Sequence, residues 1–349
     1  MVSLIGEYNY LPIDRVIYGK GSIIRINQLL SQNKIKNILI ITSKSVSQTK
    51  AFQDLLGILP VHYSIMNQIT QHTPIEEIEH ATELFQNRGC DGIISIGGGS
   101  VIDAAKVLKY YYDLGIKHIA IPTTLSASEF SHIAGYTIGG EKEGIRDKAI
   151  TPNIVFLDPD FTMETPDILW RSSGIRALDH AVETIIQPNI LDISKVAALE
   201  AIKMLFNNLS SGTPESRLEC QIAAWYSYLQ VYDSPMGISH NLGKIIGAKY
   251  EIPHGITSCI TLPKVMEFYA RIYPEEMRKI SSAITGNNEQ KENPENAAFL
   301  VDTFIKSLGL KRTLRDYNVT QKDVDYIMSK LKTKEDWYVD LLNSLINET

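Results

Sequence analysis

The chain has 349 residues, of which 44% are hydrophobic and 21% charged, so it can bury large cores and still cover a polar surface. Its formal net charge of −6, without a long basic cluster, argues against a general nucleic-acid binder. No apolar run has the length of a membrane span, and the first seven residues lack the basic segment and apolar core of a signal peptide. The three cysteines, Cys90, Cys220 and Cys259, are scattered, which favours a reducing cytoplasm over a disulfide framework.

Up to about residue 158, strand-like and helix-like segments alternate. Short runs rich in β-branched residues predict buried strands. A Thr-Pro-Ile-Glu sequence predicts a helix with Thr73 as its N-cap and Pro74 in its first position. The alternation predicts an α/β domain over residues 1–158, with a mostly parallel sheet covered on both faces. The predicted strands are 37–42, 61–65, 92–96, 118–122 and 153–157, and the predicted helices are 74–87 and 101–112.

The most informative motif in this half is the triple glycine Gly97–Gly99, which lies between a predicted strand and a helix that Ser100 opens. Glycines let the backbone approach a ligand, and the N–H groups and dipole of a helix N-terminus favour an anion, so we expect phosphate binding. Asp103 stands where the acid of a capping box would, and Lys106 adds positive charge. The spacing matches neither the Walker loop nor the GxGxxG fingerprint, and a tight strand-to-helix connection is the alternative.

After residue 158 the sequence predicts an all-helical domain over residues 159–349. Apolar residues recur there with helical spacing, and a polar stretch at 287–293 predicts a surface loop. Ligands of parallel sheets bind at the carboxyl ends of the strands, and small ligands commonly bind at domain junctions, so we expect the active site in a cleft between the domains. The predicted helices are 174–186, 193–209, 214–232, 239–248, 274–283 and 294–308.

Histidines on three separate segments of the helical half form a second group. Arg176 and His180 are four residues apart, as are His240 and Lys244, so each pair shares one helix face. Asp179 points about 100° away from His180 around the helix axis. Neutral imidazole is a common ligand for zinc and iron, so the histidines could converge on a metal, or each could be an ordinary polar or capping residue. The three histidines are His180, His240 and His254.

Four ordered motifs together resemble the iron-containing alcohol dehydrogenase superfamily, from about residue 18 to residue 263. They are Gly97–Ser100, Pro122–Thr124, Ser128–Glu129, and His240 with Pro253–Gly255. The resemblance implies a Rossmann-like dinucleotide-binding domain followed by a helical domain, a homodimer, and hydride transfer between NADH or NADPH and a carbonyl or alcohol. The positions implied to contact the cofactor are Ser43, Lys44, Gly97, Gly98, Gly99, Ser100, Asp103, Thr123, Thr124 and Ser128.

One departure from the family pattern concerns the metal. Metal-dependent members use an Asp and a His four residues apart on one helix, followed by two more histidines. In this chain Arg176 stands at the Asp position, and its permanent positive charge would repel a divalent ion. The short chain and a Thr-Thr segment one residue shorter are similar to the metal-independent maleylacetate reductase branch. We therefore expect metal-free reduction of a small oxo-acid, such as maleylacetate to 3-oxoadipate, by NADH or NADPH.

The same resemblance assigns roles to the polar residues of the helical half. Metal-free reduction needs positive groups that polarise the C=O bond, for which Arg176 and Lys244 are candidates, while the three histidines are candidate proton donors. Lys244 replaces a histidine that is common in the family. Its apolar neighbours 245–247 predict a packed environment, and a surface lysine is the alternative. Tyr136 and Arg146 could line the cleft or lie on the surface.

The residue after the second predicted strand bears on cofactor choice. NAD-specific enzymes commonly place an acid there to bind the ribose hydroxyls, whereas this chain has Ser43 followed by Lys44. With no carboxylate to repel a 2′-phosphate, we expect use of both cofactors with a preference for NADPH. The alternative is that the two are plain turn residues.

Three other interpretations remain open. A metal-dependent alcohol or polyol dehydrogenase would use His180, His240 and His254 as a three-histidine site, and bound iron or zinc would favour it. A phosphate-eliminating synthase related to dehydroquinate synthase shares the architecture, although the Thr-Thr and Ser-Glu segments argue against it. A non-catalytic cofactor-binding protein would bind NADPH without turning over any carbonyl.

Overall fold

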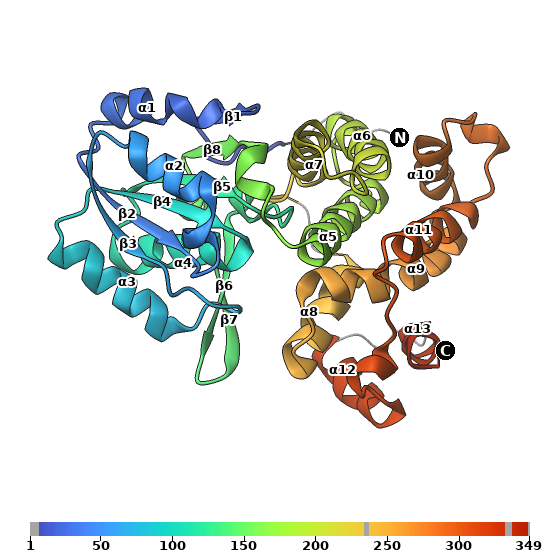
Figure 1. Cartoon of the computed structure of the whole chain (residues 1–349). Coiled ribbons are helices and arrows are strands. Elements are labelled where there is room, and N and C mark those ends of the chain that lie inside the picture. The colour runs from blue at the N-terminus through green and yellow to red at the C-terminus, as the bar shows by residue number, and fades with distance from the viewer. Residues whose placement is uncertain (1–6, 234–236, 332–336, 348–349) are drawn as a thin grey trace. The chain divides into compact units, whose positions relative to one another are not determined.

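The structure is a computed structural model that describes residues 7–233, 237–331 and 337–347. The expectation about a signal peptide concerns the start of the chain, which falls mostly in residues 1–6, outside the described range. The chain forms two compact units, treated separately below (Figure 1). The first contains residues up to 165 together with 211–225 and 230–232, and the second contains the remainder. The domains 1–158 and 159–349 stay a proposal. Within the described residues, no helix combines the length and apolar character needed to cross a membrane.

The first unit is built on a wholly parallel, six-stranded sheet with the strand order β1-β8-β5-β4-β2-β3. Its inner strands are short apolar runs that are buried along nearly their whole length, because helices cover both faces. The strands are β1 (Arg15–Tyr18), β2 (Asn37–Thr42), β3 (His62–Met66), β4 (Gly92–Gly97), β5 (Lys117–Pro122) and β8 (Ile154–Leu157).

Two hydrophobic cores lie on opposite faces of this sheet. Ile38 and Ile40 of β2 pack with α1 (Ile26–Gln32) and α2 (Lys50–Ile58). The alternate residues Leu39 and Ile41 pack on the other side. There the cover is α3 (Ile75–Asn87) and α4 (Gly99–Tyr112), as Figure 1 shows. The predicted α/β architecture, with a parallel sheet covered on both faces, is confirmed.

The start of α3 differs from the prediction. The N-cap is Pro74 and makes no side-chain cap, so the assignment of Thr73 as N-cap is wrong. Thr73 has a φ of 54°, and its hydroxyl donates to the carbonyl oxygen of Ser100 at 3.1 Å. Its own carbonyl accepts from the N–H of Thr137 at 3.0 Å. Tertiary contacts with α4 and with a later strand therefore override the local capping signal.

A two-stranded antiparallel hairpin, β6 (Ile133–Ile138) and β7 (Glu141–Arg146), follows β5 and was not predicted. Its second strand is too polar to show an apolar run. The signal for it was the Gly139–Gly140 pair, whose φ values of 56° and 85° allow the tight turn of a hairpin.

The second unit is helical, as predicted. α5 is buried throughout 172–186 and packs against α6, α8 and α9. It begins at Asp167, directly after Pro166, which is earlier than predicted. α9 was not predicted; Pro263 lies inside it, where a proline removes a helical hydrogen bond and weakens the helix signal. The helices are α5 (Asp167–Ile186), α6 (Asp192–Asn208), α8 (Ile238–Tyr250), α9 (His254–Ile272), α10 (Pro274–Thr285), α11 (Asn296–Ser307), α12 (Val324–Leu331) and α13 (Trp337–Ile346).

Most of α7 (Pro214–Ser227) belongs to the first unit although it follows α6 in the chain. Arg217 donates a hydrogen bond to the carbonyl oxygen of Thr162. The ring of Trp225 stacks on Phe130 with centroids 5.5 Å apart. The helix ends at Ser227, earlier than the predicted end at residue 232. These contacts attach the segment 211–225 to the sheet-containing unit.

Candidate active site

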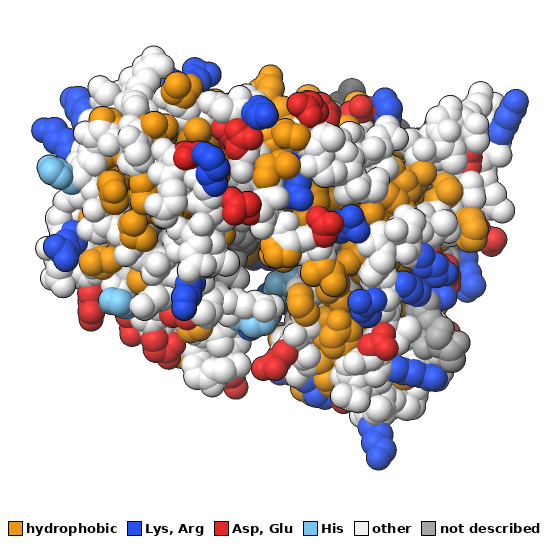
Figure 2. Space-filling view, in the orientation of Figure 1, with side chains coloured by type: hydrophobic (Ala, Val, Ile, Leu, Met, Phe, Trp, Pro, Cys, Tyr) orange, Lys and Arg blue, Asp and Glu red, His pale blue; other side chains and the backbone are white. Residues whose placement is uncertain are grey.

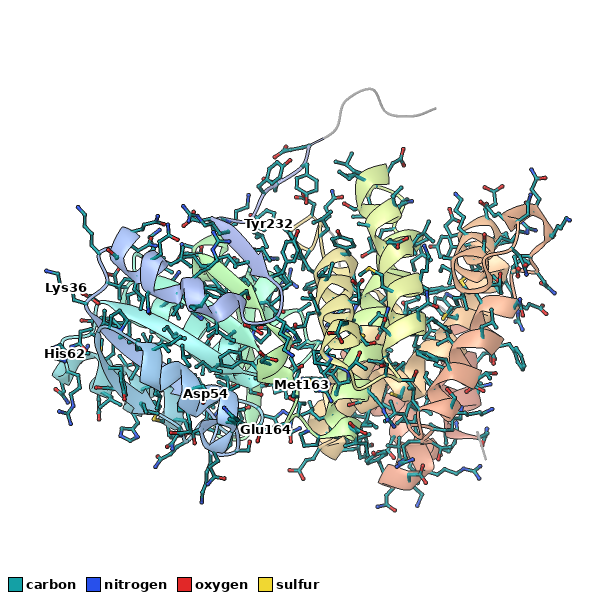
Figure 3. All side chains as sticks on the ribbon, turned by 45° about the horizontal axis from the view of Figure 1, so that its top comes forward. Lys36, Asp54, His62, Met163, Glu164 and Tyr232 are labelled. Atoms are coloured by element: carbon teal, nitrogen blue, oxygen red, sulfur yellow. The ribbon has the colours of Figure 1, made fainter. Side chains whose placement is uncertain are left out.

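Three of the segments singled out in the sequence meet at the carboxyl edge of the sheet. The strands β2, β4 and β5 are parallel neighbours, so the turns that follow them lie at one edge. Figure 3 labels Lys36 and His62, near the starts of β2 and β3, at one end of the sheet, and Glu164, which follows β8, at the other. The N–H of Thr123 donates to the carbonyl oxygen of Gly97 at 3.0 Å and joins two of these turns.

The triple glycine packs closely against its surroundings. A Cβ added to Gly97 would lie 2.7 Å from Val101, and one added to Gly98 would lie 3.1 Å from Thr124. A Cβ on Gly99 would lie 3.2 Å from Ser126. The 14-residue α4 starts at Gly99 and has no side-chain cap. The first N–H groups of α4 therefore face no capping side chain. The glycine turn 97–99 and the loop after β5 fit the pyrophosphate of a dinucleotide.

Asp103 does not complete a capping box, so that expectation is wrong. Its carboxylate accepts from the hydroxyl of Ser128 and, at 3.0 Å, from the N–H of Gly135. The fully buried Lys106 donates to the carbonyl of Ser128 and, at 2.9 Å, to that of Ile133. Burial lowers the pKa of Lys106, which the charge of Asp103 opposes. The two side chains thus hold the loop after β5 against α4.

Ser43 and Lys44 lie in the turn directly after β2. The hydroxyl of Ser43 accepts a hydrogen bond from the N–H of Val46, the first residue of a short 3₁₀ turn, at 3.3 Å. Lys44 is exposed. Residues 43–49 contain no carboxylate, so nothing in this turn opposes a 2′-phosphate.

In the second unit, a buried arginine joins α5 to α8 and α9. Arg176 donates from Nη2 to Nε2 of His240 at 2.7 Å and from Nη1 to the hydroxyl of Ser258 at 3.0 Å. Nη1 also lies 3.4 Å from Oδ2 of Asp179. A guanidinium can only donate, so Nε2 of His240 is the acceptor and the imidazole carries its proton on Nδ1.

His180 lies beside this contact. Its ring stacks on Tyr228 with centroids 4.3 Å apart and is 5.4 Å from the ring of His240. Burial, and then the charge of Arg176, lowers the pKa of both His180 and His240 well below the usual range. Both imidazoles are therefore neutral at neutral pH and serve as hydrogen-bonding groups rather than as cationic acids.

Lys244 and His254 complete the group of five. The charge of each contributes to the lowered pKa of His240, so both lie near it. Lys244 is exposed, and the prediction of a packed environment is wrong, because its neighbour Ile246 faces the core while Lys244 lies on another face of α8. His254 is the first residue of α9 and is also exposed.

Two acidic residues of α5 were missed. Asp179 is fully buried and accepts from the hydroxyls of Ser258 at 2.6 Å and Ser239 at 3.0 Å, besides its contact with Arg176. Glu183 accepts from two backbone N–H groups of α8. Burial raises the pKa of both carboxyls. Their spacing of three and seven residues from Arg176, which keeps them near its face of the helix, was the available signal.

The residues present do not fit a divalent metal ion. The lone pair on Nε2 of His240, which a metal would need, already accepts from the guanidinium of Arg176. Among the residues that the structure describes, no three His, Cys, Asp or Glu side chains come together as a metal site requires.

The two further cleft candidates, Tyr136 and Arg146, both belong to the first unit. Tyr136 is buried in the first unit, and its hydroxyl is 2.6 Å from that of Tyr111 on α4. Arg146 is exposed at the end of β7. The cleft between the domains stays a prediction.

Comparison with known proteins covers nearly the whole chain. The family model for iron-containing alcohol dehydrogenase matches residues 13–159, and the C-terminal model of the Fe-containing alcohol dehydrogenase family matches residues 171–335. The maleylacetate reductase of Pseudomonas aeruginosa is 28% identical over 320 residues, which cover 90% of this chain and 87% of that protein.

Solved structures share the fold. The iron-containing alcohol dehydrogenase of Corynebacterium glutamicum superposes with a TM-score of 0.88 at 23% identity and covers 99% of this chain and 98% of its own. The maleylacetate reductase of Agrobacterium tumefaciens superposes with a TM-score of 0.86 at 22% identity, with 98% of each chain covered.

Proposed function

Because this chain belongs to the iron-containing alcohol dehydrogenase family and is an NAD(P)-dependent oxidoreductase, we propose that it reduces a small oxo-acid without a metal. The first substrate to test is maleylacetate, whose reduction gives 3-oxoadipate. The hydrogen bond from Arg176 to Nε2 of His240, at 2.7 Å, is the observation that carries the proposal. It supports metal-free chemistry because it occupies a ring nitrogen that a metal would need and puts a permanent cation beside it.

The role of Arg176 follows from where charge develops. The bound nicotinamide supplies the hydride. Addition of that hydride to a carbonyl, or to a double bond conjugated with one, leaves negative charge on the carbonyl oxygen. A fixed cation in a buried site stabilises such charge strongly, since it needs no reorganisation during the reaction. A guanidinium also binds carboxylates through two parallel hydrogen bonds, which suits an oxo-dicarboxylate.

The proton that completes the reduction comes from another group. His180 and His240 are neutral, so we assign them to orienting the substrate by hydrogen bonds rather than to giving up a proton. Lys244 lies one helical turn after His240 on the same face of α8, and its exposed ammonium group is our first candidate donor. His254 is the second.

The cofactor side of the proposal rests on the first unit. The N-terminus of α4 would hold the pyrophosphate, and Thr123, Thr124 and the loop that Ser128 anchors would line its path. Asp103 would act by holding Ser128. Ser43 and Lys44 would tolerate a 2′-phosphate, so we propose use of both NADH and NADPH with a preference for NADPH.

The assembly and surroundings form part of the proposal. We propose a homodimer in the cytoplasm, where the three free, buried cysteines stay reduced. On the face shown in Figure 2, acidic and basic side chains of the described residues are interspersed. That distribution suits a small-molecule enzyme better than a nucleic-acid binder.

The test is oxidation of NADPH and NADH in the presence of maleylacetate, with protein treated with a strong chelator and metal analysis of untreated protein. Turnover by metal-stripped protein is the expected result. Activity on alcohols that is lost with the chelator and restored by iron or zinc would favour the three-histidine alternative. Binding of NADPH without turnover of any carbonyl in a panel would indicate a non-catalytic protein.

A further inference from the structure

Glu183 of α5 caps a different helix. Its Oε2 accepts from the N–H of Gly237 at 3.0 Å, and its Oε1 accepts from the N–H of His240 at 3.1 Å. Gly237 is the N-cap of α8, and His240 is its third helical residue. These are the two N–H groups that a capping box satisfies within one helix. Here a buried carboxylate from a neighbouring helix satisfies both, while the N-cap residue itself has no side chain to offer.

The contact leaves no room for another side chain. Gly237 has φ −76° and ψ −171°, which any residue can adopt, so the backbone conformation does not require glycine. A Cβ at this position would lie 2.3 Å from Cδ of Glu183. The carboxylate, rather than the turn, therefore excludes a larger residue at 237. The hydroxyl of Tyr269 accepts from the next N–H, that of Ile238, at 3.4 Å, so α9 also supports this first turn.

His240 is thus held twice by the same helix. Arg176 of α5 donates to its imidazole, and Glu183, two turns further along α5, accepts from its backbone N–H. We propose that Glu183 is a positioning residue that keeps His240 in contact with Arg176 by fixing the first turn of α8. This inference rests on the proposed function only in assuming that the substrate reacts beside these two side chains.

The test compares Glu183→Ala, Gly237→Ala and the double variant. Displacing a reacting-site group by ~1 Å can lower a rate by about 100-fold. We expect each single variant to lower kcat by at least about tenfold, with the KM for NADPH changed by less than about twofold. In the double variant, loss of the Glu183 carboxylate removes the clash at residue 237. Its kcat should therefore equal that of Glu183→Ala, and multiplied losses would overturn the proposal.

Glu183→Gln separates capping from folding. The glutamine keeps the size and one acceptor oxygen, so it should recover part of the activity lost in Glu183→Ala. The control is Glu292→Ala in the same unit, where the carboxylate is also buried and accepts from Thr285 and Asn296. It should lower stability and leave kcat unchanged. Equal losses of kcat in the Glu292 and Glu183 variants would indicate a merely structural role.

A second readout does not need a substrate. Hydrogen exchange of the peptide 237–243 should be at least about tenfold faster in Glu183→Ala than in the unsubstituted protein, because two amides lose their acceptor. Unchanged exchange would overturn the proposal even if activity fell. If the unsubstituted protein does not reduce maleylacetate, the proposed substrate is wrong. The role of Glu183 is then still decided by hydrogen exchange and by the turnover of whichever carbonyl the protein does reduce.

Discussion

At the scale of single residues, the site is organised around one buried positive charge. Arg176 has three partners, on α5, α8 and α9: Asp179, His240 and Ser258. The carboxylate of Asp179 and the hydroxyl of Ser258 offset the burial of the guanidinium. The contact with His240 turns one edge of that imidazole toward the cation. Arg176 therefore supplies the positive charge that these three side chains share.

Removing this charge should affect the chemistry. Arg176→Ala should lower kcat/KM for the oxo-acid by about 100- to 1,000-fold, the range for loss of one group that stabilises an oxyanion. Arg176→Lys should lose less of kcat/KM, because it keeps the charge. Some loss should remain, because a lysine cannot serve all three partners. Steady-state kinetics with chelator-treated protein measure both. Arg171→Ala is the matched control, since Arg171 lies on the same helix and pairs with Asp167 at 3.1 Å. Unchanged kinetics of Arg176→Ala would contradict the assignment.

Glu129 provides a pH-dependent test in the first unit. Burial raises its pKa from 4.5 to about 7, and its Oε2 has no hydrogen-bond partner. Between these pH values the folded protein binds more protons than the unfolded chain, so this group's contribution to stability falls as pH rises. At pH 8 the loss is about 3 kcal/mol.

Glu129→Gln should therefore raise the midpoint of thermal unfolding at pH 8 and change it little at pH 4.5. The variant must be compared with the unsubstituted protein at each pH, because His132 also changes its protonation over this pH range. Burial lowers the pKa of His132 to about 4, so its contribution to stability is full above pH 6.5 and is lost as pH falls toward 4. A gain at pH 4.5 as large as that at pH 8 would contradict the reasoning.

At the scale of elements, we propose that the turn after β2 decides which cofactor fits. Ser43→Asp should weaken NADPH binding by at least about tenfold, which corresponds to ~1.4 kcal/mol, and leave NADH binding nearly unchanged. The physical reason is repulsion between the new carboxylate and a 2′-phosphate. Lys44→Ala should weaken NADPH binding alone if its ammonium contacts that phosphate. Dissociation constants from fluorescence titration measure both variants. Parallel losses for the two cofactors would point to a distorted turn.

The elements that the sequence predicted are those whose signal is local. β2 and the helices of the second half are apolar runs or regular stripes, and most were found within a few residues. The hairpin β6–β7 was missed because its second strand is polar. α9, which has Pro263 in its interior, was also missed. In both cases the segment has a weak or misleading pattern of its own: packing buries α9, whereas β7 stays mostly exposed and is held by its pairing with β6.

The same distinction applies to the site. The family motifs predicted Arg176, His180 and His240, and the structure brings these three together. Glu183 and Asp179 were not assigned to the site, because the groups that they hold on α8 and α9 are distant in sequence. The partner N–H of Gly237 is 54 residues from Glu183, and the hydroxyl of Ser258 is 79 residues from Asp179. No local pattern encodes a hydrogen bond between helices, so such residues emerge only once the helices are packed.

At the scale of the whole molecule, the buried cysteines can report how the chain divides. Burial raises the pKa of Cys90 to about 11 and that of Cys220 to about 12, and Cys259 is fully buried. All three thiols should react slowly with a disulfide reagent until the protein unfolds. Cys90 and Cys220 lie in the first unit, and Cys259 lies in the second.

If the units unfold separately in denaturant, Cys220 should become reactive together with Cys90 and not with Cys259. Mass spectrometry of labelled peptides at each denaturant concentration measures this. The expectation follows from the contacts that tie residues 211–225 to the first unit, including the stacking of Trp225 on Phe130. Labelling of Cys220 with Cys259 would instead favour a division of the chain at residue 158.

On the proposed metal-free mechanism, the arginine on α5 also sets the conditions under which the protein can work. A guanidinium is covalently part of the polypeptide, so it cannot dissociate, exchange for a competing ion or be oxidised as a ferrous ion can. The positive charge at Arg176 is complete as soon as the chain has folded. A cell that makes this protein supplies that charge through translation alone, whether iron is scarce or oxygen is abundant.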